Sequence, residues 1–289
     1  MEMIRASALA WMTGEGTTSG LTRARDWTAS LVASALRFGT GSFVGQIGAR
    51  PAGRLTLFDD ERCPDCRRVR EVLSTLDLDV DIRPCPRGGK RFRDDLRRVA
   101  GESHPPCLVD HAESRVVYGA DAIVVHLCER YGTGSVPWGH RLGPISRMTG
   151  RLATGGRSTP SVALPSVRPG LPLDLWGYEG AAECRRVRDV LCTYEMPFTL
   201  HNVARGSAKR RALLRPGSAG RIPCLVDLNT GAVLADSCAI ASYVRRIYGE
   251  ARAARDPKVA AARDAHTSEP PHAARHAWVR SGGAASAAT

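Results

Sequence analysis

The sequence contains two copies of one unit, and this repeat constrains the fold more than any other feature. Residues 66–73 read CRRVREVL and residues 184–191 read CRRVRDVL, so seven of eight positions are identical. The pentapeptide PCLVD occurs at 106–110 and again at 223–227. In both copies a Tyr-Gly pair follows, with its tyrosine 25 residues after the proline of PCLVD. The offset of 117 to 118 residues is too long for a solenoid repeat, so the sequence predicts two separately folded units.

The repeat divides the chain of 289 residues into five segments. In order, they are an N-terminal extension that is partly helical (1–50), a first domain (51–132), a linker (133–170), a second domain (171–249) and a C-terminal tail (250–289). The linker is rich in Gly, Pro, Ser and Arg, so we expect a flexible segment draped over a surface. The tail has no lasting apolar period and is expected to be disordered. In the extension, apolar residues at helical spacing from Trp27 to Phe38 predict a helix that packs on a domain.

Within each unit, short apolar runs and helical periodicities predict the element order βαβαββα, which is an α/β fold. In the first unit the predicted strands begin at Leu55 and Val80, and Pro64 suits the first position of the helix between them. A second helix is predicted around 92–99, followed by a hairpin over 107–118 and a last helix. The second unit repeats this order.

The formal net charge of +12 favours acidic partners in general, such as nucleic acid, anionic lipid or small carboxylates and phosphates. A nucleic-acid binder would tend to show a dense Lys/Arg block interleaved with aromatic residues, and the sequence has none. Nucleic acid is therefore not an expected partner. A solvated basic surface is the favoured explanation of the charge.

The cysteine count points to the cytoplasm. Nine cysteines, an odd number in a chain this long, do not make a secreted disulfide framework, so reduced thiols are expected. The short apolar stretch at 6–12 lacks the features of a signal peptide. No run of 18 apolar residues occurs, and no transmembrane segment is expected.

The motif Cys-Pro-Asp-Cys at 63–66 lies at the predicted start of a helix. Unpaired backbone N–H groups and the positive end of the helix stabilise a thiolate at Cys63 and lower its pKa below the free value of ~8.5. Arg67 and Arg68 add positive charge and are predicted to stabilise this thiolate. Cys66 lies one turn further on, where it can resolve a mixed disulfide with Cys63. Next to a βαβ pattern, C-x-x-C predicts thiol or redox chemistry.

Two other interpretations of this motif stay open: a metal half-site, or surface thiols without a role. A structural zinc site needs four ligands, usually with a second close pair. The chain has no second C-x-x-C, and Cys85 alone does not complete a ligand set. No metal is therefore predicted.

Pro106 precedes a predicted strand about 40 residues after the C-x-x-C motif. This spacing fits a cis-proline loop that faces the cysteine and exposes the backbone of His104 and Pro105 to an extended peptide. The alternative is an ordinary proline at a sheet edge. Because Pro223 keeps the same place in the second copy, the cis interpretation is favoured.

The second unit has lost the helix-capping thiol. Ala181 stands where the first unit has Cys63, and Cys184, the counterpart of Cys66, is expected to be structural. Its last helix begins with Asp236-Ser237, in place of Gly-Ala in the first unit. Asp and Ser are strong helix caps, and a serine hydroxyl beside free N–H groups also suits a carboxylate. Capping and ligand binding explain this pair equally well.

These motifs resemble the thioredoxin-like N-terminal domain of glutathione transferases and the related glutaredoxins. The resemblance rests on CPDCRRVR from Cys63, on the proline before CLVD, and on Asp-Ser-Cys-Ala-Ile from Asp236. Together with Pro-Cys-Pro-Arg-Gly at 84–88 and Ala-Arg-Gly-Ser at 204–207, it extends to proteins with two such domains in tandem. The resemblance covers about 50–250 and implies two thioredoxin-like (βαβαββα) domains.

The resemblance implies that glutathione is recognised as a co-substrate. In relatives the acidic residue and serine hold the γ-glutamyl end, and the backbone before the cis-proline pairs with the cysteinyl part. Carried over, the glutathione-binding residues are Pro106, Ile222, Pro223, Asp236 and Ser237. The nucleophile carried over is the first cysteine of the C-x-x-C motif.

The sequence departs from the family in ways that bear on activity. No all-helical domain is predicted to follow, so the usual place for an electrophilic co-substrate is missing. The first unit keeps the thiol without the serine, and the second keeps Asp-Ser without the thiol. The predicted function is a glutaredoxin-like, glutathione-linked thiol–disulfide oxidoreductase that acts through Cys63 on thiol and disulfide substrates. A conjugating glutathione transferase and a non-catalytic module that binds glutathione or a partner are the alternatives.

Overall fold

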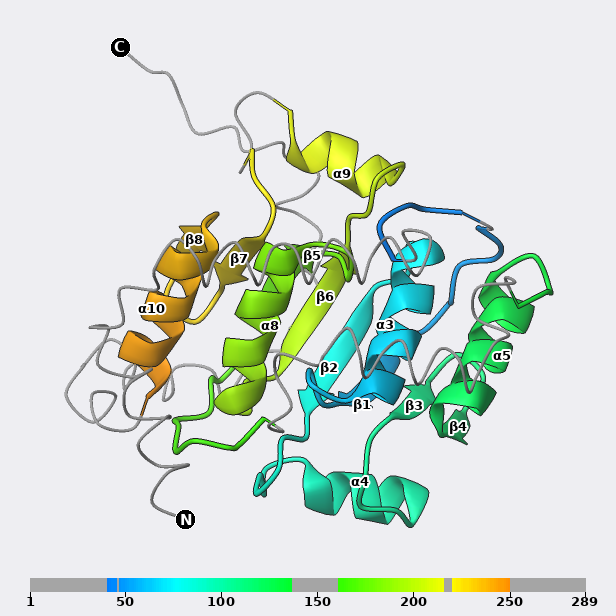
Figure 1. The fold of residues 1–289 in the computed structure, drawn as a ribbon, viewed down its shortest axis with the longest axis horizontal. Helices are drawn as coiled ribbons and strands as arrows, with labels where there is room; N and C mark the ends of the chain where they lie inside the picture. Colours follow the sequence, from blue (N-terminus) through cyan, green and yellow to red (C-terminus); the bar gives the residue numbers. More distant parts are fainter. Residues whose placement is uncertain (1–40, 46, 137–160, 216–219, 250–289) are drawn as a thin grey trace.

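A computed structural model describes the protein over residues 41–45, 47–136, 161–215 and 220–249. One sheet crosses the molecule, with helices packed against it (Figure 1). The helix predicted at 27–38, the C-terminal tail and the linker residues 137–160 lie outside the described residues.

The first unit has seven elements in the predicted order βαβαββα. They are β1 (Leu55–Asp59), α3 (Pro64–Thr75), β2 (Val80–Pro84), α4 (Arg93–Ala100), β3 (Cys107–Asp110), β4 (Arg115–Tyr118) and α5 (Ala120–Tyr131). Pro64 occupies the first turn of α3, where its missing N–H costs nothing. Gly101, with φ of 70°, ends α4 in the left-handed conformation that glycine adopts without strain.

The second unit repeats this order. Its elements are β5 (Leu173–Gly177), α8 (Ala182–Thr193), β6 (Phe198–Asn202), α9 (Ala208–Leu213), β7 (Cys224–Asp227), β8 (Ala232–Leu234) and α10 (Ser237–Tyr248). Both units therefore have the expected thioredoxin-like fold. In Figure 1 the helices α3, α5, α8 and α10 cover one face of the sheet, and α4 and α9 lie at its opposite ends.

The repeat length predicts two separately folded units, but the structure joins them. Their strands form one eight-stranded sheet in the order β4-β3-β1-β2-β6-β5-β7-β8. The junction is the antiparallel pair of β2 and β6, the second strand of each unit. Each unit would otherwise present this strand as an open edge with unpaired backbone groups. Edge-to-edge pairing removes both edges at once.

The register at the junction defines a pseudo-twofold axis. Asp81 lies opposite Thr199, which is its own equivalent in the second unit, and Val80 lies opposite Leu200, the equivalent of Ile82. Thr199 donates its hydroxyl to the carboxylate of Asp81 at 2.7 Å. The junction is thus isologous in the sense used for symmetric dimers, although both halves belong to one chain.

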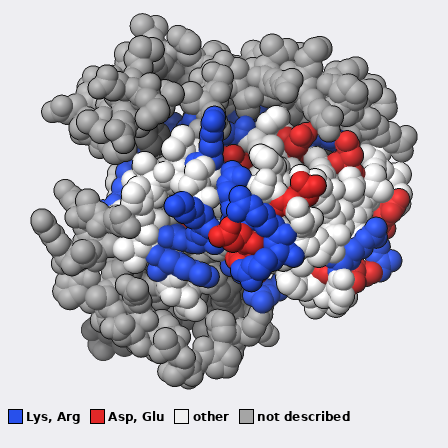
Figure 2. All heavy atoms as spheres, turned by 90° about the horizontal axis from the view of Figure 1, so that it is seen from below, with Lys and Arg blue, Asp and Glu red and all other residues white. Residues whose placement is uncertain are grey.

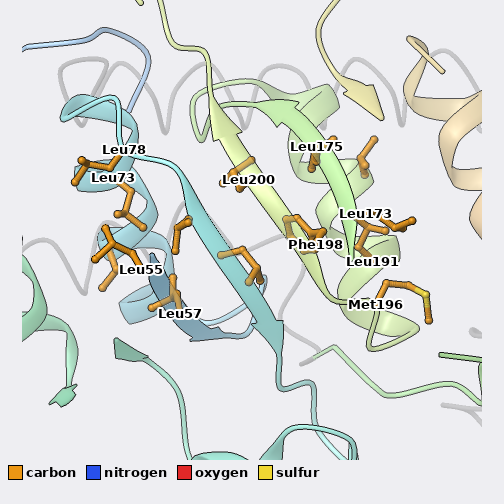
Figure 3. Packing of buried hydrophobic residues seen from close by; sticks show 14 of the residues in the cluster. Leu55, Leu57, Leu73, Leu78, Leu173, Leu175, Leu191, Met196, Phe198 and Leu200 are labelled. Carbon is orange, nitrogen blue, oxygen red and sulfur yellow. The ribbon is translucent and has the colours of Figure 1, made fainter. Parts of the chain in front are cut away.

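The hydrophobic core also continues across the junction. One cluster of buried side chains contains Leu55 and Leu57 from the first unit together with Leu175 and Phe198 from the second (Figure 3). Burial of this apolar surface holds the two units together in addition to the backbone hydrogen bonds of the β2–β6 pair.

Charged side chains fill the space between α3 and α8. Glu61, Arg70, Glu179 and Arg188 are all buried and form what we call the inter-unit ion network. Arg70 Nε donates to Glu179 at 3.0 Å, and Arg188 Nε donates to Glu61 at 2.8 Å. Each arginine also contacts the glutamate of its own unit, at 3.4 Å for Arg70 and 2.5 Å for Arg188. Two positive charges and two negative charges are therefore buried in alternation.

Each unit also ties its last helix to its hairpin through a buried aspartate. Asp110 accepts a hydrogen bond from Tyr131 at 2.6 Å and contacts His126 Nε2 at 2.9 Å. In the second unit Asp227 accepts hydrogen bonds from Tyr243 and Tyr248, both at 2.6 Å. The aspartates and tyrosines of PCLVD and Tyr-Gly thus explain why both motifs recur in the sequence.

Segments outside the two units are anchored where the structure describes them. The amides of Leu164 and Val167 donate to the carbonyl oxygens of Thr193 and Tyr248 in the second unit, both at 2.8 Å. Arg87 of the first unit forms backbone hydrogen bonds with Ser161 at 2.7 Å and with Ala163 at 3.0 Å, so this part of the linker lies against both units. From the N-terminal extension, the amide of Val44 donates to the Arg205 carbonyl oxygen at 2.8 Å. These contacts show ordered packing for part of the linker, which its composition marks as flexible, and for part of the N-terminal extension.

Candidate active site

Cys63 is the N-cap of α3, as predicted. Its backbone is extended, with φ of −75° and ψ of 124°, and its thiol accepts a hydrogen bond from the amide of Cys66 at 3.5 Å. The side chain is partly exposed, and the thiol is free. At this position the thiol meets the unpaired N–H groups of the first helical turn, which favour its anionic form.

The two thiols of the motif have opposite electrostatic surroundings. The pKa of Cys63 is lowered, chiefly by a hydrogen bond from the Cys66 thiol and further by the amides of Cys66 and Asp65, although burial opposes this. The pKa of Cys66 is raised well above its ordinary value, first by burial and then by its interactions with Cys63. Cys66 is fully buried, and its sulfur accepts a hydrogen bond from the amide of Asp60 at 3.4 Å. Cys63 is thus the thiol equipped to be a nucleophile.

The peptide bond before Pro106 is cis, and so is the bond before Pro223. The cis interpretation of these prolines is therefore confirmed in both units. Pro106 lies directly before β3, and its carbonyl oxygen accepts a hydrogen bond from the amide of Gly119 at 3.1 Å. Ahead of it, His104 is exposed and Pro105 is partly exposed, so the predicted backbone segment is accessible.

Arg67 and Arg68 follow the motif, but carboxylates hold both guanidinium groups. Arg67 contacts Glu71 at 3.2 Å and Glu179 at 3.6 Å, and Arg68 contacts Asp121 at 2.6 Å. Both arginines are buried, and neither is among the principal causes of the lowered pKa of Cys63. The contacts therefore give these two side chains a packing role and do not support the predicted stabilisation of the thiolate.

Asp59 is a residue of the site that sequence reasoning missed. It ends β1, is buried, and contacts Arg70 at 2.5 Å. Burial raises its pKa to about 6 even though the charge of Arg70 lowers it. Its charge is also one cause of the raised pKa of Cys66. The signal was present in the repeat, because Gly177 stands at this place in the unit that has lost its nucleophile.

The second unit keeps the architecture of the site without its thiol. Ala181 is the N-cap of α8 and makes no side-chain capping bond. Cys184 is fully buried, and burial raises its pKa to about 11, which agrees with the expected structural role. Pro223 is buried and Ile222 partly buried beside a small apolar cluster that includes Trp176.

Asp236 and Ser237 already have hydrogen-bond partners within the protein. Asp236 caps α10 by accepting hydrogen bonds from the amides of Cys238 at 2.9 Å and Ala239 at 2.8 Å. The hydroxyl of Ser237 donates to the carboxylate of Glu183 and accepts from Arg186 at 3.2 Å. A carboxylate of a ligand would have to displace that of Glu183 at this hydroxyl. These contacts favour the capping interpretation of the pair.

The candidate sites of the two units face opposite ends of the sheet. Strand β1 is parallel to β2, β2 is antiparallel to β6, and β6 is parallel to β5. Helices α3 and α8 therefore begin at opposite ends, and Figure 1 shows α4 and α9 separated in the same way. Five residues of strand span about 16 Å, so a ligand held at Asp236 and Ser237 lies beyond the reach of Cys63 in the same chain.

Other site types find no support within the described residues. No group of three His, Cys, Asp or Glu side chains there is arranged to hold a metal ion. Among the same residues, none of the helices has both the length and the apolar character to cross a bilayer.

Within the described residues, fold and site together define a thioredoxin-like protein that has a thiol at the N-cap of α3 and a cis-proline in each unit. The family model for the N-terminal domain of glutathione S-transferases matches the chain twice, over residues 57–135 and 175–252. These segments cover more than half of the chain, which therefore belongs to this family and contains its domain in tandem. No curated protein and no solved structure matches the chain. Domains of this family generally bind glutathione, so the match supports a function related to glutathione.

Proposed function

We propose that the protein is a glutathione-linked thiol–disulfide oxidoreductase with Cys63 as its nucleophile. The observation that carries this proposal is the contrast within the C-x-x-C motif. Cys63 is a partly exposed helix cap with a lowered pKa, whereas Cys66 is buried with a raised pKa. A thiolate is the reactive form in disulfide exchange, so only the first thiol is ready to attack.

The reaction exchanges one disulfide for another. The Cys63 thiolate attacks the glutathionyl sulfur of a mixed disulfide, the new Cys63–glutathione disulfide forms, and the substrate leaves as a thiolate that takes a proton from water. A glutathione thiolate then attacks the glutathionyl sulfur, which releases glutathione disulfide and restores the Cys63 thiolate. In the net reaction one glutathione thiol is oxidised, because its sulfur enters glutathione disulfide, and the substrate sulfur is reduced from the mixed disulfide to a thiol. Cys66 stands by, because little of it is ionised.

The surroundings of Cys63 suit an anionic co-substrate. Figure 2 views the molecule from the end at which α4 lies, and Lys and Arg side chains gather on that face. Exposed basic residues of α4 and the loop before it include Arg87, Lys90, Arg97 and Arg98. Glutathione has two carboxylates, and a basic surface raises the local concentration of anions. In the proposal, glutathione meets Cys63 beside the cis peptide bond of Pro106, in the first unit.

The second unit serves mainly as a structural partner in this proposal. Its Asp236 caps α10, and Ile222 packs beside an apolar cluster. Calorimetry on the full chain is expected to show one glutathione per chain, with affinity unchanged by Ser237→Ala. Two sites per chain, or loss of binding in this variant, would return the second unit to a glutathione-binding role.

The decisive experiment is glutathione-dependent reduction of the mixed disulfide of glutathione and 2-mercaptoethanol. Cys63→Ser should abolish turnover, and Cys66→Ser should retain it. Cys238→Ser is the matched control, because Cys238 is an exposed cysteine in the first turn of α10 at the other end of the sheet. Full activity in Cys63→Ser would refute the proposal. Conjugation of a model electrophile in place of disulfide turnover would instead favour the transferase alternative.

A further inference from the structure

Strand β4 exposes two large apolar side chains. Val116 is 45% exposed and Tyr118 is 42% exposed, whereas Val117 between them is 6% exposed. Alternate residues of a strand point to opposite faces, so Val116 and Tyr118 share the face that Val117 does not use. We call this pair the β4 strip. It lies on the last strand of the sheet, whose outer edge pairs with no other strand among the described residues.

The β4 strip leads to the candidate active site. Tyr118 lies opposite Cys107 in the β3–β4 pair, and Cys107 directly follows the cis-proline. The next residue, Gly119, donates its amide to the Pro106 carbonyl oxygen. Burial of part of the phenol raises the pKa of Tyr118, and the charges of Glu102, Cys107, Cys63 and Cys66 raise it further. The strand pairing and the hydrogen bond of Gly119 thus place Tyr118 next to the cis-proline segment.

The second unit provides an internal comparison for this aromatic ring. Val233 is the counterpart of Val116 and is also exposed, at 47%. The counterpart of Tyr118, however, is Ala235. The copy with a thiol at the helix cap therefore has tyrosine beside its cis-proline, and the copy with Ala181 has alanine. Both copies have the exposed valine, but only the unit that contains Cys63 has the aromatic residue.

We propose that Tyr118 is a specificity residue, which contacts the peptide part of a disulfide substrate and favours substrates with apolar residues beside the reacting cysteine. A substrate bonded to the Cys63 sulfur must pass the cis-proline, and an extended chain leaving that point meets the β4 strip. The aromatic ring offers such a chain a large apolar contact at small cost in side-chain entropy. The substrate class is thus protein or peptide disulfides. This inference deepens the proposed function and rests on its assignment of the nucleophile.

A single-turnover experiment tests the inference without glutathione. The full chain with Cys238→Ser is mixed with peptides whose cysteine is activated as a 2-pyridyl disulfide. The Cys63 thiolate displaces pyridine-2-thione, which is followed by absorbance, and a disulfide forms between Cys63 and the peptide. Two peptides are compared, which differ only in having leucine or serine on either side of the cysteine. The rate constants are measured for this Cys238→Ser protein and for the same protein with Tyr118→Ala, Tyr118→Phe or Val233→Ala added.

The expected result is a preference for the leucine peptide that Tyr118→Ala reduces by about 10-fold, as for loss of a modest apolar contact. Tyr118→Phe should retain the preference, because the ring remains, and Val233→Ala should not change it. Equal rates for the two peptides in the wild type, or equal slowing of both in Tyr118→Ala, would overturn the inference. Failure of glutathione turnover with intact peptide preference would instead refute the proposed function alone.

Discussion

Arg70 and Arg188 occupy equivalent positions of the repeat, and each donates its Nε–H to a glutamate of the other unit, at 3.0 Å and 2.8 Å respectively. Both arginine side chains are 1% exposed. Burial of a charge is tolerated only when an opposite charge and hydrogen bonds replace the lost water. The alternation of two arginines with Glu61 and Glu179 meets this condition for each charge, which makes the network sensitive to the loss of one member.

Arg188→Met is expected to lower the free energy of unfolding by about 3–5 kcal/mol, because it leaves buried carboxylates without their compensating charge. Urea unfolding of the full chain provides the measurement. Arg97→Met is the matched control, since Arg97 pairs with Asp94 on the exposed surface of α4, and such a pair contributes about 0–1 kcal/mol. Equal stability of the two variants would show that the buried network contributes no more than a surface pair.

His201 should make the stability of the protein depend on pH. Burial lowers the pKa of this histidine, but hydrogen bonds to Asp174 and Asp79 outweigh burial and raise it to about 9 from its ordinary 6.5. A raised pKa means that the folded state binds the proton more tightly than the unfolded state. The stabilisation is therefore complete below pH 6.5 and is lost as the pH rises through 9.

Unfolding free energies measured from pH 6 to pH 10 should fall with pH in the wild type and fall less in His201→Gln. His104→Gln is the control, because His104 is exposed and makes no contact with this cluster in the described structure. Titration of the His201 ring by NMR gives the pKa directly. A midpoint near 6.5 would contradict the expectation.

Loss of one hydrogen bond to the buried Asp110 or to the buried Asp227 is expected to lower the free energy of unfolding by similar amounts. Tyr131→Phe removes a hydroxyl donor from Asp110, and Tyr248→Phe removes one from Asp227. Each variant is expected to cost about 1–3 kcal/mol of unfolding free energy, since a charged acceptor loses a buried partner. Denaturant unfolding gives both values, with the exposed Tyr118→Phe as reference. A large effect in one unit only would mean that the two tyrosines are not equivalent.

Cysteine reactivity should separate Cys63 from the other eight thiols. With iodoacetamide at neutral pH, Cys63 should be modified first and the exposed Cys238 next. Burial raises the pKa of four other thiols to about 11, namely Cys107, Cys128, Cys184 and Cys224. Mass spectrometry at several pH values follows each site, and the rate at Cys63 should rise with a midpoint below the ordinary pKa of a thiol. Modification of Cys66 before Cys63 would reverse the assigned roles.

The repeat carried most of the fold information in the sequence. Conserved spacing between the two copies predicted the element order and the cis-prolines, and the cap at Cys63 followed from Pro64 and the helical periodicity. These are local features, fixed by turn chemistry and by backbone restrictions of proline. The two parts of the candidate site that depend on such local features, the start of α3 and the cis-proline loop, could therefore be predicted.

The joining of the two units could not be predicted from such local features. Arg67, Arg70 and Glu71 lie on a helix where charged residues ordinarily face water, yet all three are buried against the second unit. A single sequence does not show that two charged faces of α3 and α8 neutralise each other. The ion pairs of Arg67 with Glu179 and of Arg68 with Asp121 join residues that are far apart in the sequence, so these contacts could not be predicted from the motif itself.

The register at the junction favours two units that differ from each other. A position on a twofold axis meets itself, so two identical copies of the first unit joined in this way would place Asp81 against Asp81, two carboxylates in direct repulsion. Two copies of the second unit would place Thr199 against Thr199. Two copies within one chain can differ at this position, and here Thr199 donates a hydrogen bond to Asp81. Pairing of β2 with β6 within one chain is therefore favoured over pairing of β2 with the β2 strand of a second copy.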